Sequence, residues 1–389
     1  MPVLGLRGTG SFSADDRPKN YREILLFLKP NTEAPLTALM GRSKEKATDD
    51  AEFKWFEKGL PQQRVTVSGS QTSSDTTIEI TGSAQAKIFK KGHAVINERT
   101  LEVFWVTADP SSPHTSINVA RGKGSTAAAM NDLDGLLILG SHHPEGAAVP
   151  TAVSYDATVV NNFTEIFRTT LDLTETARVT RLRWDEAGPM REAKREALEL
   201  HSIEMEKQFL FGSKVEDTSG AQPERTTQGL NSFVTSNVKD FADAVDIDSW
   251  ENFLEDIFED GSNEKLALIG NRALNVINKL VRNNTEMVVT PKDQTFGMAM
   301  TTYLTPYGTL MLRQHPLLSK NATFNDWGFI VDMAHIVIRP LRSRDTSYKE
   351  NRQDSGTDAR KDEYLSEIGL EVNHESTHAI FKNASAFSA

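Results

Sequence analysis

The clearest periodic pattern of hydrophobic and polar residues lies between Pro189 and Gly212. Apolar residues recur there at the spacing of a helix face. One set is Met190, Ala193, Ala197 and Leu200, and a second is Leu198, Met205 and Phe209. Proline suits the first position of a helix, and glycine suits the position just after its end. The pattern therefore predicts a helix over 189–211 that is about 35 Å long.

The region from about residue 60 to residue 140 has a strand-like pattern instead. Its short segments are rich in β-branched residues and are separated by Gly, Ser, Asp and Pro, which is typical of strands joined by turns. We interpret it as a long β excursion or a small barrel-like insert, with 51–61 as a strand before it and 163–182 as a returning strand pair. The predicted strands are RVTVSG (64–69), TTIEITG (76–82), KIFKKGHAVI (87–96), LEVFWVTA (101–108), TSINVARG (115–122) and GLLILGS (135–141).

The last third of the chain mixes both patterns. Helices are predicted at about 248–260 and 271–283, and strands between and after them. The segment 363–383 alternates like a strand. We therefore expect a second compact α/β domain. The strand candidates are LALIG, MVVT, AMTTYLT, GTLMLRQ and GFIVDMAHIVIRPL.

The first 20 residues are small, polar and charged, without apolar periodicity, which predicts an extended arm. An apolar segment, 21–29, follows and stops at Pro30. A short helix capped by Asn31 or Thr32 is predicted next. An arm of this kind has no core of its own, so we expect a neighbouring molecule to hold it. The chain starts at Met1, and we expect no cleaved N-terminal segment.

Composition excludes several classes of protein. The 389 residues carry a net charge of −11, whereas a protein that grips duplex DNA needs a basic excess. The chain has no cysteine, so disulfides, thiolate metal sites and cysteine nucleophiles are excluded. No apolar run is long enough for a signal peptide or a membrane span. We expect a protein made in a reducing cytoplasm.

The sharpest chemical motif is His374-Glu375-Ser376-Thr377-His378, which matches the H-E-x-x-H signature of zinc hydrolases. That chemistry needs an α-helix, because only a helix brings the two histidines to one face. The flanking residues alternate like a strand, on which the histidines would lie roughly 13 Å apart. We therefore expect solvent-exposed strand residues and no metal site.

Three other motifs are weaker still. Asp354-Ser355-Gly356-Thr357 matches an aspartic-protease motif but occurs once, after a polar stretch, so a charged loop is predicted. Residues 122–126 (GKGST) lack the spacing of a phosphate loop and suggest a Gly-rich turn. His142 and His143 precede a predicted turn and are expected to bind no metal. The sequence predicts no catalytic, cofactor-binding or metal-ligating residue, which favours a structural protein over an enzyme.

The order of these elements resembles the major capsid protein of tailed bacteriophages, which has the Hong Kong 97-type fold. No single segment is a specific motif, but their order and spacing together carry the resemblance over nearly the whole chain. The segments are NTEAPL (31–36), FKW (53–55), ARGKGSTAAAM (120–130), EGA (145–147), NNFTEIFRTTLDLTETA (161–177), IEMEKQFLFGSK (203–214), RTTQGLNSFV (225–234), YLTPYGTLMLRQHPLL (303–318) and DMAHIVIRPLRS (332–343).

The resemblance implies an α+β fold with four parts. Residues 1–30 would be an N-terminal arm, and 52–165 an extended E-loop with a β insert that is longer than a minimal E-loop. An axial α/β domain would span 225–325. The peripheral domain, with 189–211 as its spine helix, would comprise 31–51, 166–224 and 326–389. Arms and long β loops need neighbours to bury their apolar side, and Val103, Phe104, Trp105 and Val106 lie in such a loop.

The resemblance also implies a function. The chain would self-assemble as hexamers and pentamers into the icosahedral head around the phage double-stranded DNA, without cofactors. It would be made in the host bacterial cytoplasm and end in the virion. Its partners would be itself, a separate scaffolding protein, the portal, optionally a cement protein, and packaged DNA by proximity only, with no membrane. No pattern identifies a Lys–Asn crosslink between subunits.

Two alternatives stay open. One is a zinc hydrolase that uses His374, Glu375 and His378. The other is a different phage structural protein, such as a tail component. Zinc content and particle shape distinguish these possibilities from a capsid.

Overall fold

The structure is a computed structural model that describes residues 46–59, 63–82, 85–150, 152–180, 189–283, 288–295 and 298–388. The chain divides into two compact units, one formed by 1–55 with 160–389 and the other by 56–159. The chain passes between them within a two-stranded ribbon of β1 (Glu52–Glu57) and β8 (Thr158–Phe163). The predicted arm, the apolar segment 21–29 and the short helix after it lie outside the described residues.

Residues 56–159 form a small closed β-barrel. Six strands pair in the order β2-β7-β4-β5-β6-β3. The two ends of this sheet meet where the Ser68 N–H donates to the Glu79 carbonyl and the Thr81 N–H donates to the Thr66 carbonyl, at 2.9 and 2.8 Å. The barrel-like insert predicted from the sequence is therefore confirmed. Its elements are β2 (Arg64–Thr66), β3 (Thr77–Glu79), the 3₁₀ turn η2 (Gln85–Ile88), β4 (His93–Asn97), β5 (Val103–Val106), β6 (Ser116–Ala120) and β7 (Gly135–Ser141).

The barrel has a hydrophobic core of its own. Phe104 and Val106 on β5 point into it and are buried, whereas Trp105 between them is 37% exposed. The expectation that 103–106 needs a neighbouring subunit for burial is wrong for Phe104 and Val106. Closure of the sheet brings the inward side chains of six strands together, so the insert buries its apolar face without help.

The other unit contains a four-stranded antiparallel sheet built around β21 (Ala359–Val372), with β9 (Glu165–Thr174) along one side. The predicted returning strand pair at 163–182 is wrong, because β9 is one strand followed by a short helix. The Thr174 hydroxyl accepts the Ala177 N–H at 3.2 Å, which caps α2 and ends the strand. The other elements are β19 (Ile336–Pro340), β20 (Ser347–Lys349) and α2 (Glu175–Val179).

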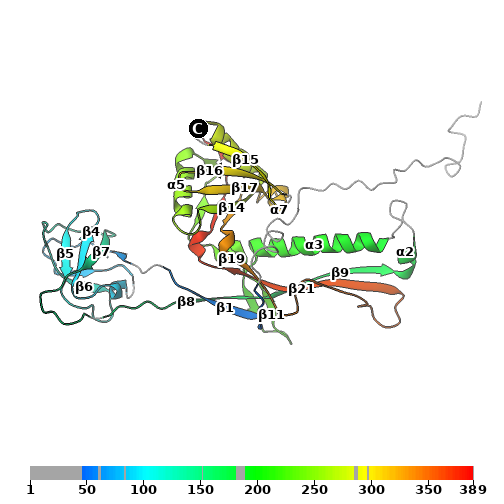
Figure 1. The fold of residues 1–389 in the computed structure, drawn as a ribbon, viewed down its shortest axis with the longest axis horizontal. Helices are drawn as coiled ribbons and strands as arrows, with labels where there is room; N and C mark the ends of the chain where they lie inside the picture. The colour runs from blue at the N-terminus through cyan, green and yellow to red at the C-terminus, as the bar shows by residue number, and fades with distance from the viewer. Residues whose placement is uncertain are drawn as a thin grey trace, which may run out of the picture. The chain divides into compact units, whose positions relative to one another are not determined.

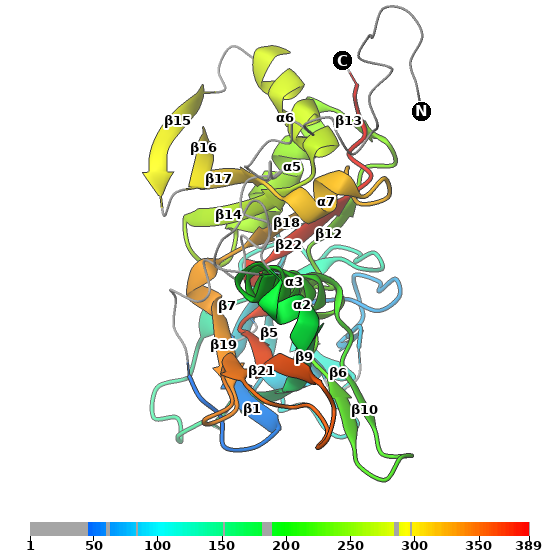
Figure 2. The ribbon, with the colours of Figure 1, turned by 90° about the vertical axis from the view of Figure 1, so that its right-hand side faces the viewer.

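The long helix α3 runs from Pro189 to Phe211, as the sequence predicts. It lies along β9 and β21 in both ribbon views (Figures 1 and 2). The residues that it buries repeat every four positions, so one face packs against the sheet. Leu198 and Leu200 lie off this face and are exposed. The buried set is Ala197, His201, Met205, Glu206, Phe209 and Leu210.

The same unit also contains a seven-stranded mixed sheet, with its strands in the order β12-β22-β18-β14-β17-β16-β15. It includes β18 and β22 from 326–389, a range that the sequence analysis groups with the peripheral domain. One face of the sheet packs against α3, α4 and α7, and the other against α5 and α6. The strands are β12 (Val238–Asp240), β14 (Glu264–Ile269), β15 (Val288–Thr295), β16 (Met298–Leu304), β17 (Thr309–Gln314), β18 (Gly328–Val331) and β22 (Ala379–Lys382).

The helices and short elements around this sheet complete the unit. The predicted helices at 248–260 and 271–283 are confirmed as α5 and α6. The remaining bounds are α4 (Leu230–Phe233), α5 (Ile247–Phe258), α6 (Asn271–Asn283), α7 (Pro316–Lys320), η3 (Met333–His335), η4 (Glu375–Thr377), the hairpin β10 (Val215–Asp217) and β11 (Glu224–Thr226), and the pair β13 (Ala244–Val245) and β23 (Ala386–Phe387).

Substituting Ala197 tests the role of α3 as a central helix. Ala197 is buried in the middle of the helix, so Ala197→Pro removes a backbone hydrogen bond and costs roughly 3 kcal/mol or more. We expect insoluble or assembly-dead protein. Ala197→Gly is the matched control and costs only about 1 kcal/mol. Normal yield and thermal stability of the proline variant would contradict a central role for α3.

Candidate functional site

The H-E-x-x-H segment is a turn, and the strand predicted there is wrong. Glu375–Thr377 form a single 3₁₀ turn, and His374 precedes it with a left-handed φ of 53°. The strand β22 begins only at Ala379. The α-helix that would place both histidines on one face is therefore not formed.

His378 is completely buried, so the prediction of a solvent-exposed residue is wrong for it. The next residue enters a central strand of the seven-stranded sheet, which draws His378 into the interior. Its Nδ1 accepts the backbone N–H of Asp332 at 3.2 Å. Burial lowers the pKa of His378 to about 4, so its ring is neutral at pH 7. This histidine positions the chain between β18 and η3.

Glu375 binds the backbone of a neighbouring segment. Its carboxylate accepts the N–H of Thr235 and the N–H of Ser236, the second at 2.7 Å, and also both hydroxyl groups. Burial acts to raise the pKa of Glu375, but these hydrogen bonds outweigh it and leave the pKa below its ordinary value. All four hydrogen bonds go to Oε1, and the carboxylate therefore holds the loop after α4 against η4.

The remaining residues near the motif do not complete a metal site. The His335 and His374 rings pack edge to face with their centres 5.7 Å apart. Within the described part of the chain, no group of three or more His, Asp or Glu side chains is arranged to hold a metal ion. The zinc-hydrolase alternative gains no support from this geometry.

Lys265 stabilises the same junction from β14. Its buried ammonium donates to the carbonyls of Ile257, Asp260 and Thr377, at 2.7, 2.7 and 2.8 Å. Burial lowers the pKa of Lys265 to about 8. The side chain thus binds the end of α5 and η4 to the central strand of the sheet. Sequence reasoning missed this residue, because a lysine in an apolar strand gives no signal of its partners.

The other predicted motifs lie in loops. Residues 354–357 are an exposed turn in which the Thr357 N–H donates to the Asp354 carbonyl. In the GKGST segment, Gly122 and Gly124 have left-handed φ values of 66° and 75°, as a Gly-rich turn requires. The loop and turn interpretations of these two motifs are confirmed.

The segment 120–130 is anchored by a buried ion pair. Arg121 donates to both carboxylate oxygens of Glu102, at 2.6 and 2.7 Å, and both side chains are buried. The same carboxylate accepts the N–H groups of Gly122 and Ala128. This pair fixes the β6–β7 loop on the barrel, and the sequence analysis did not identify it.

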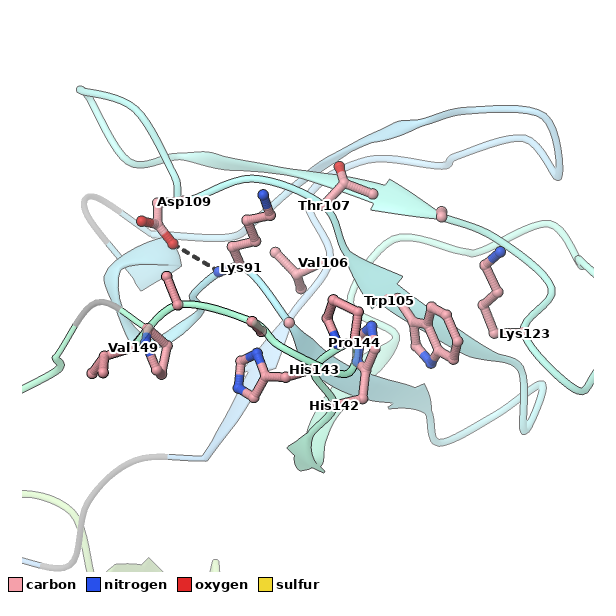
Figure 3. A pocket seen from close by; sticks show the side chains of 15 residues that line it. Lys91, Trp105, Val106, Thr107, Asp109, Lys123, His142, His143, Pro144 and Val149 are labelled. Carbon is pink, nitrogen blue, oxygen red and sulfur yellow. Dashed lines mark hydrogen bonds between the residues drawn. The ribbon is translucent and has the colours of Figure 1, made fainter.

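His142 and His143 lie at a cleft of about 590 Å³ on the barrel (Figure 3). The His142 ring stacks on Trp105 with 3.9 Å between ring centres, and the Lys123 ammonium lies 5.0 Å from the centre of the same indole. Asp109 accepts the backbone N–H of Lys91 at 2.7 Å. The arrangement is a mixed aromatic and cationic surface with no nucleophile and base in contact.

Exposed elements are the remaining candidates for function. The β10–β11 hairpin projects beyond the four-stranded sheet (Figure 2), and Val215 on it is exposed. Ile166 on β9 is exposed too, with Leu198 and Leu200 on α3. Exposed apolar side chains of this kind are typical of contact surfaces between proteins. No described helix is long and apolar enough to cross a membrane.

Comparisons with known proteins identify the family. A model described as the SU10 major capsid protein matches residues 7–385. The major capsid protein of Pseudomonas phage PaMx41 is 25% identical over 355 residues, which are 87% of this chain and 82% of that protein. The capsid asymmetric unit of cyanophage A-1(L) superposes with a TM-score of 0.50 at 10% identity, covering 96% of this chain and 98% of that chain, and is similar in fold. The predicted α+β capsid fold of the Hong Kong 97 type is confirmed, and because the family model spans nearly the whole chain, the chain belongs to the SU10 major capsid protein family and is a major capsid protein of a phage.

Proposed function

We propose that the chain assembles as hexamers and pentamers into an icosahedral shell that encloses the double-stranded DNA genome of the phage. The observation that carries this proposal is the match of the capsid family model over 7–385. As a capsid protein the chain associates with itself and is located in the virion. We also propose that assembly takes place in the host bacterial cytoplasm. The proposed partners besides the chain itself are a separate scaffolding protein, the portal, an optional cement protein and the nearby DNA.

We assign the proposed domain roles from the sheets of the structure. We assign the peripheral domain to α3 and the four-stranded sheet, and the axial domain to the seven-stranded sheet with its helices. That assignment moves β18 and β22 from the peripheral to the axial domain, because both pair within the seven-stranded sheet. The E-loop corresponds to the β1–β8 ribbon with the barrel, and residues 1–30 to the arm.

The chain has no catalytic role in this proposal. The side chains of the H-E-x-x-H motif are used to join segments: His378 and Glu375 both bind backbone N–H groups of other segments. His378 is also completely buried, so a substrate in solvent does not reach its ring.

The pH dependence of stability tests this structural role. The folded-state pKa of His378, about 4, lies below its ordinary value of 6.5, so the unfolded chain binds more protons between these values. The stabilisation of the folded state by neutral, buried His378 is complete above pH 6.5 and is lost as the pH falls toward 4. We expect His378→Asn to cost roughly 1–3 kcal/mol at pH 7 and to flatten the pH dependence of denaturant midpoints in this window.

His374→Asn is the matched control for that experiment. His374 is only partly buried, and asparagine tolerates its left-handed backbone, so the change should stay within about 0.5 kcal/mol. Equal midpoints for the two variants at pH 7 would contradict a structural role for His378. Stoichiometric zinc lost from both variants would instead support a metal site.

Electron microscopy of the purified chain, with and without a co-expressed scaffolding protein, tests the assembly itself. We expect closed shells with hexameric and pentameric capsomers. Open tubes would favour a tail component, and a chain that stays monomeric under every assembly condition and is absent from virions would overturn the proposal.

Deletion of residues 2–20 tests the arm. These residues have no apolar periodicity, so we expect the truncated monomer to keep its fold and its denaturant midpoint. Shell yield or shell melting temperature should fall, because the proposed contacts of the arm lie between subunits. Truncated shells that melt at the wild-type temperature would show that the arm does not stabilise the shell.

A further inference from the structure

The exposed face of α5 carries only negative charge. Its buried face, with Trp250, Phe253, Leu254 and Ile257, packs into the core on the seven-stranded sheet. Every charged residue on the opposite face is acidic and exposed, and no salt bridge joins these carboxylates to another described residue. The acidic face consists of Asp248, Glu251, Glu255 and Asp256, with Glu259 at the end of the helix.

This charge pattern is unfavourable for an isolated helix. Glu251 faces Glu255 one turn later, and Glu255 faces Glu259, so like charges are neighbours at i,i+4 spacing. The last turn also carries acids where the helix dipole places partial negative charge. The Lys265 ammonium offsets part of the dipole effect, because it donates to the carbonyls of Ile257 and Asp260 at the end of α5. No salt bridge within the described residues relieves the repulsion between the exposed carboxylates, and a cationic surface from outside would relieve it.

The neighbouring helix α6 has the opposite character. Its exposed charges are Arg272, Lys279 and Arg282, and its other exposed described positions are asparagines. No salt bridge joins these cations to another described residue, although the Arg272 Nε–H donates to the Ser385 carbonyl at 3.2 Å. The basic face therefore consists of three cations without an acidic partner in the described structure.

Both helices are held firmly by one hydrophobic core. Ala273, Val276, Ile277 and Leu280 of α6 pack into the same cluster as the buried face of α5. Both helices cover the same face of the seven-stranded sheet, and α6 lies farther from α3 than α5 does (Figure 2). Each subunit thus presents one acidic and one basic helix face, and both helices pack into the same hydrophobic cluster.

We propose that the acidic face of α5 on one subunit binds the basic face of α6 on the next subunit within a capsomer. A ring forms when each copy presents two different, complementary surfaces and the rotation between copies closes. Charge complementarity selects a second copy of this chain as the occupant, since each copy carries both surfaces. This inference rests on the proposed capsomer assembly and adds the pairing that orients neighbouring subunits.

Charge reversal tests the pairing. One variant carries Glu251→Lys, Glu255→Lys and Glu259→Lys, and a second carries Arg272→Glu, Lys279→Glu and Arg282→Glu. We expect each to remain folded by circular dichroism and to lose shell yield at least tenfold at low salt. The variant that combines all six substitutions has complementary faces with reversed signs and should recover most of the shell yield.

Mixing the two triple variants gives a sharper test. One variant then presents two basic faces and the other two acidic faces, so complementary contacts require the two to alternate around the ring. A ring of six can alternate, but a ring of five cannot. We expect the equimolar mixture to form hexameric capsomers and to fail to form pentamers, as seen by native mass spectrometry and electron microscopy.

The matched control reverses three exposed carboxylates on the barrel unit: Glu79→Lys, Glu145→Lys and Asp156→Lys. It changes the net charge as much as the α5 variant does and should keep near wild-type yield. If the α5 variant forms shells at the wild-type yield, the inference is wrong. The proposed function is judged separately, by whether the wild-type chain forms shells. If the variant with all six substitutions stays folded but forms no shells, the inference is also wrong. The acidic face would then bind a cationic segment of another protein.

Discussion

The pairing of β21 with β9 is the constraint on which the peripheral part of the structure depends. The two strands pair over ten successive residues, from Ala359 opposite Thr174 to Ile368 opposite Glu165. Beyond that point β21 continues to Val372 and pairs with β19 on its other side. Since α3 packs on this sheet, the register of one strand pair sets the position of the helix, of β19 and of the chain that continues into η4 and β22.

The outer face of β21 explains why this register is well defined. Glu363, Glu367 and Glu371 recur at every fourth residue on one face, and all three are largely buried. They form ion pairs with Arg168, Arg344 and Arg339, respectively. The opposite face carries Ile368, Leu370 and Val372 in the core with α3. A slip by one residue would place the carboxylates in the apolar core, where an unpaired buried charge costs several kcal/mol.

Local patterns in the sequence were sufficient for the long helix and for the barrel. Pro189 begins α3, because its fixed φ suits the first helical position. Gly212 follows the end of the helix, where a side chain would collide with the carbonyls of Gln208 and Thr227. The strand segments of 56–159 alternate and are separated by turn residues, so their number and approximate places were predictable. The short turn at η4 was missed, because the predicted strand extends the alternation of Ile368, Leu370 and Val372 through the polar residues 373–378. His374 also adopts a left-handed conformation without a glycine to signal it.

The burial of certain polar residues was the other feature that could not be predicted from the sequence. His378, Lys265 and Glu375 look like surface residues in the sequence. However, the Asp332 N–H that binds His378 is 46 residues away, and the Ser236 N–H that binds Glu375 is 139 residues away. Lys265 binds the nearby carbonyls of Ile257 and Asp260 and also that of Thr377, which is 112 residues away. Those contacts depend on the order of strands in the seven-stranded sheet, and that order places β22 beside β12 and β18. No short-range pattern encodes such pairing, whereas the acidic face of α5 can be read directly from the sequence.

The closed barrel of 56–159 has a consequence for how this capsid protein can change over time. Its core consists of residues of the unit itself, and the chain enters and leaves the unit through a single ribbon. Substitutions inside the barrel are therefore selected mainly by the barrel's own folding, while substitutions around β21 must satisfy a helix and three strands together. Evolution can remodel or replace the barrel as a cassette, and an engineer can use its loops to carry foreign peptides, without altering the residues that set the register of the peripheral sheet.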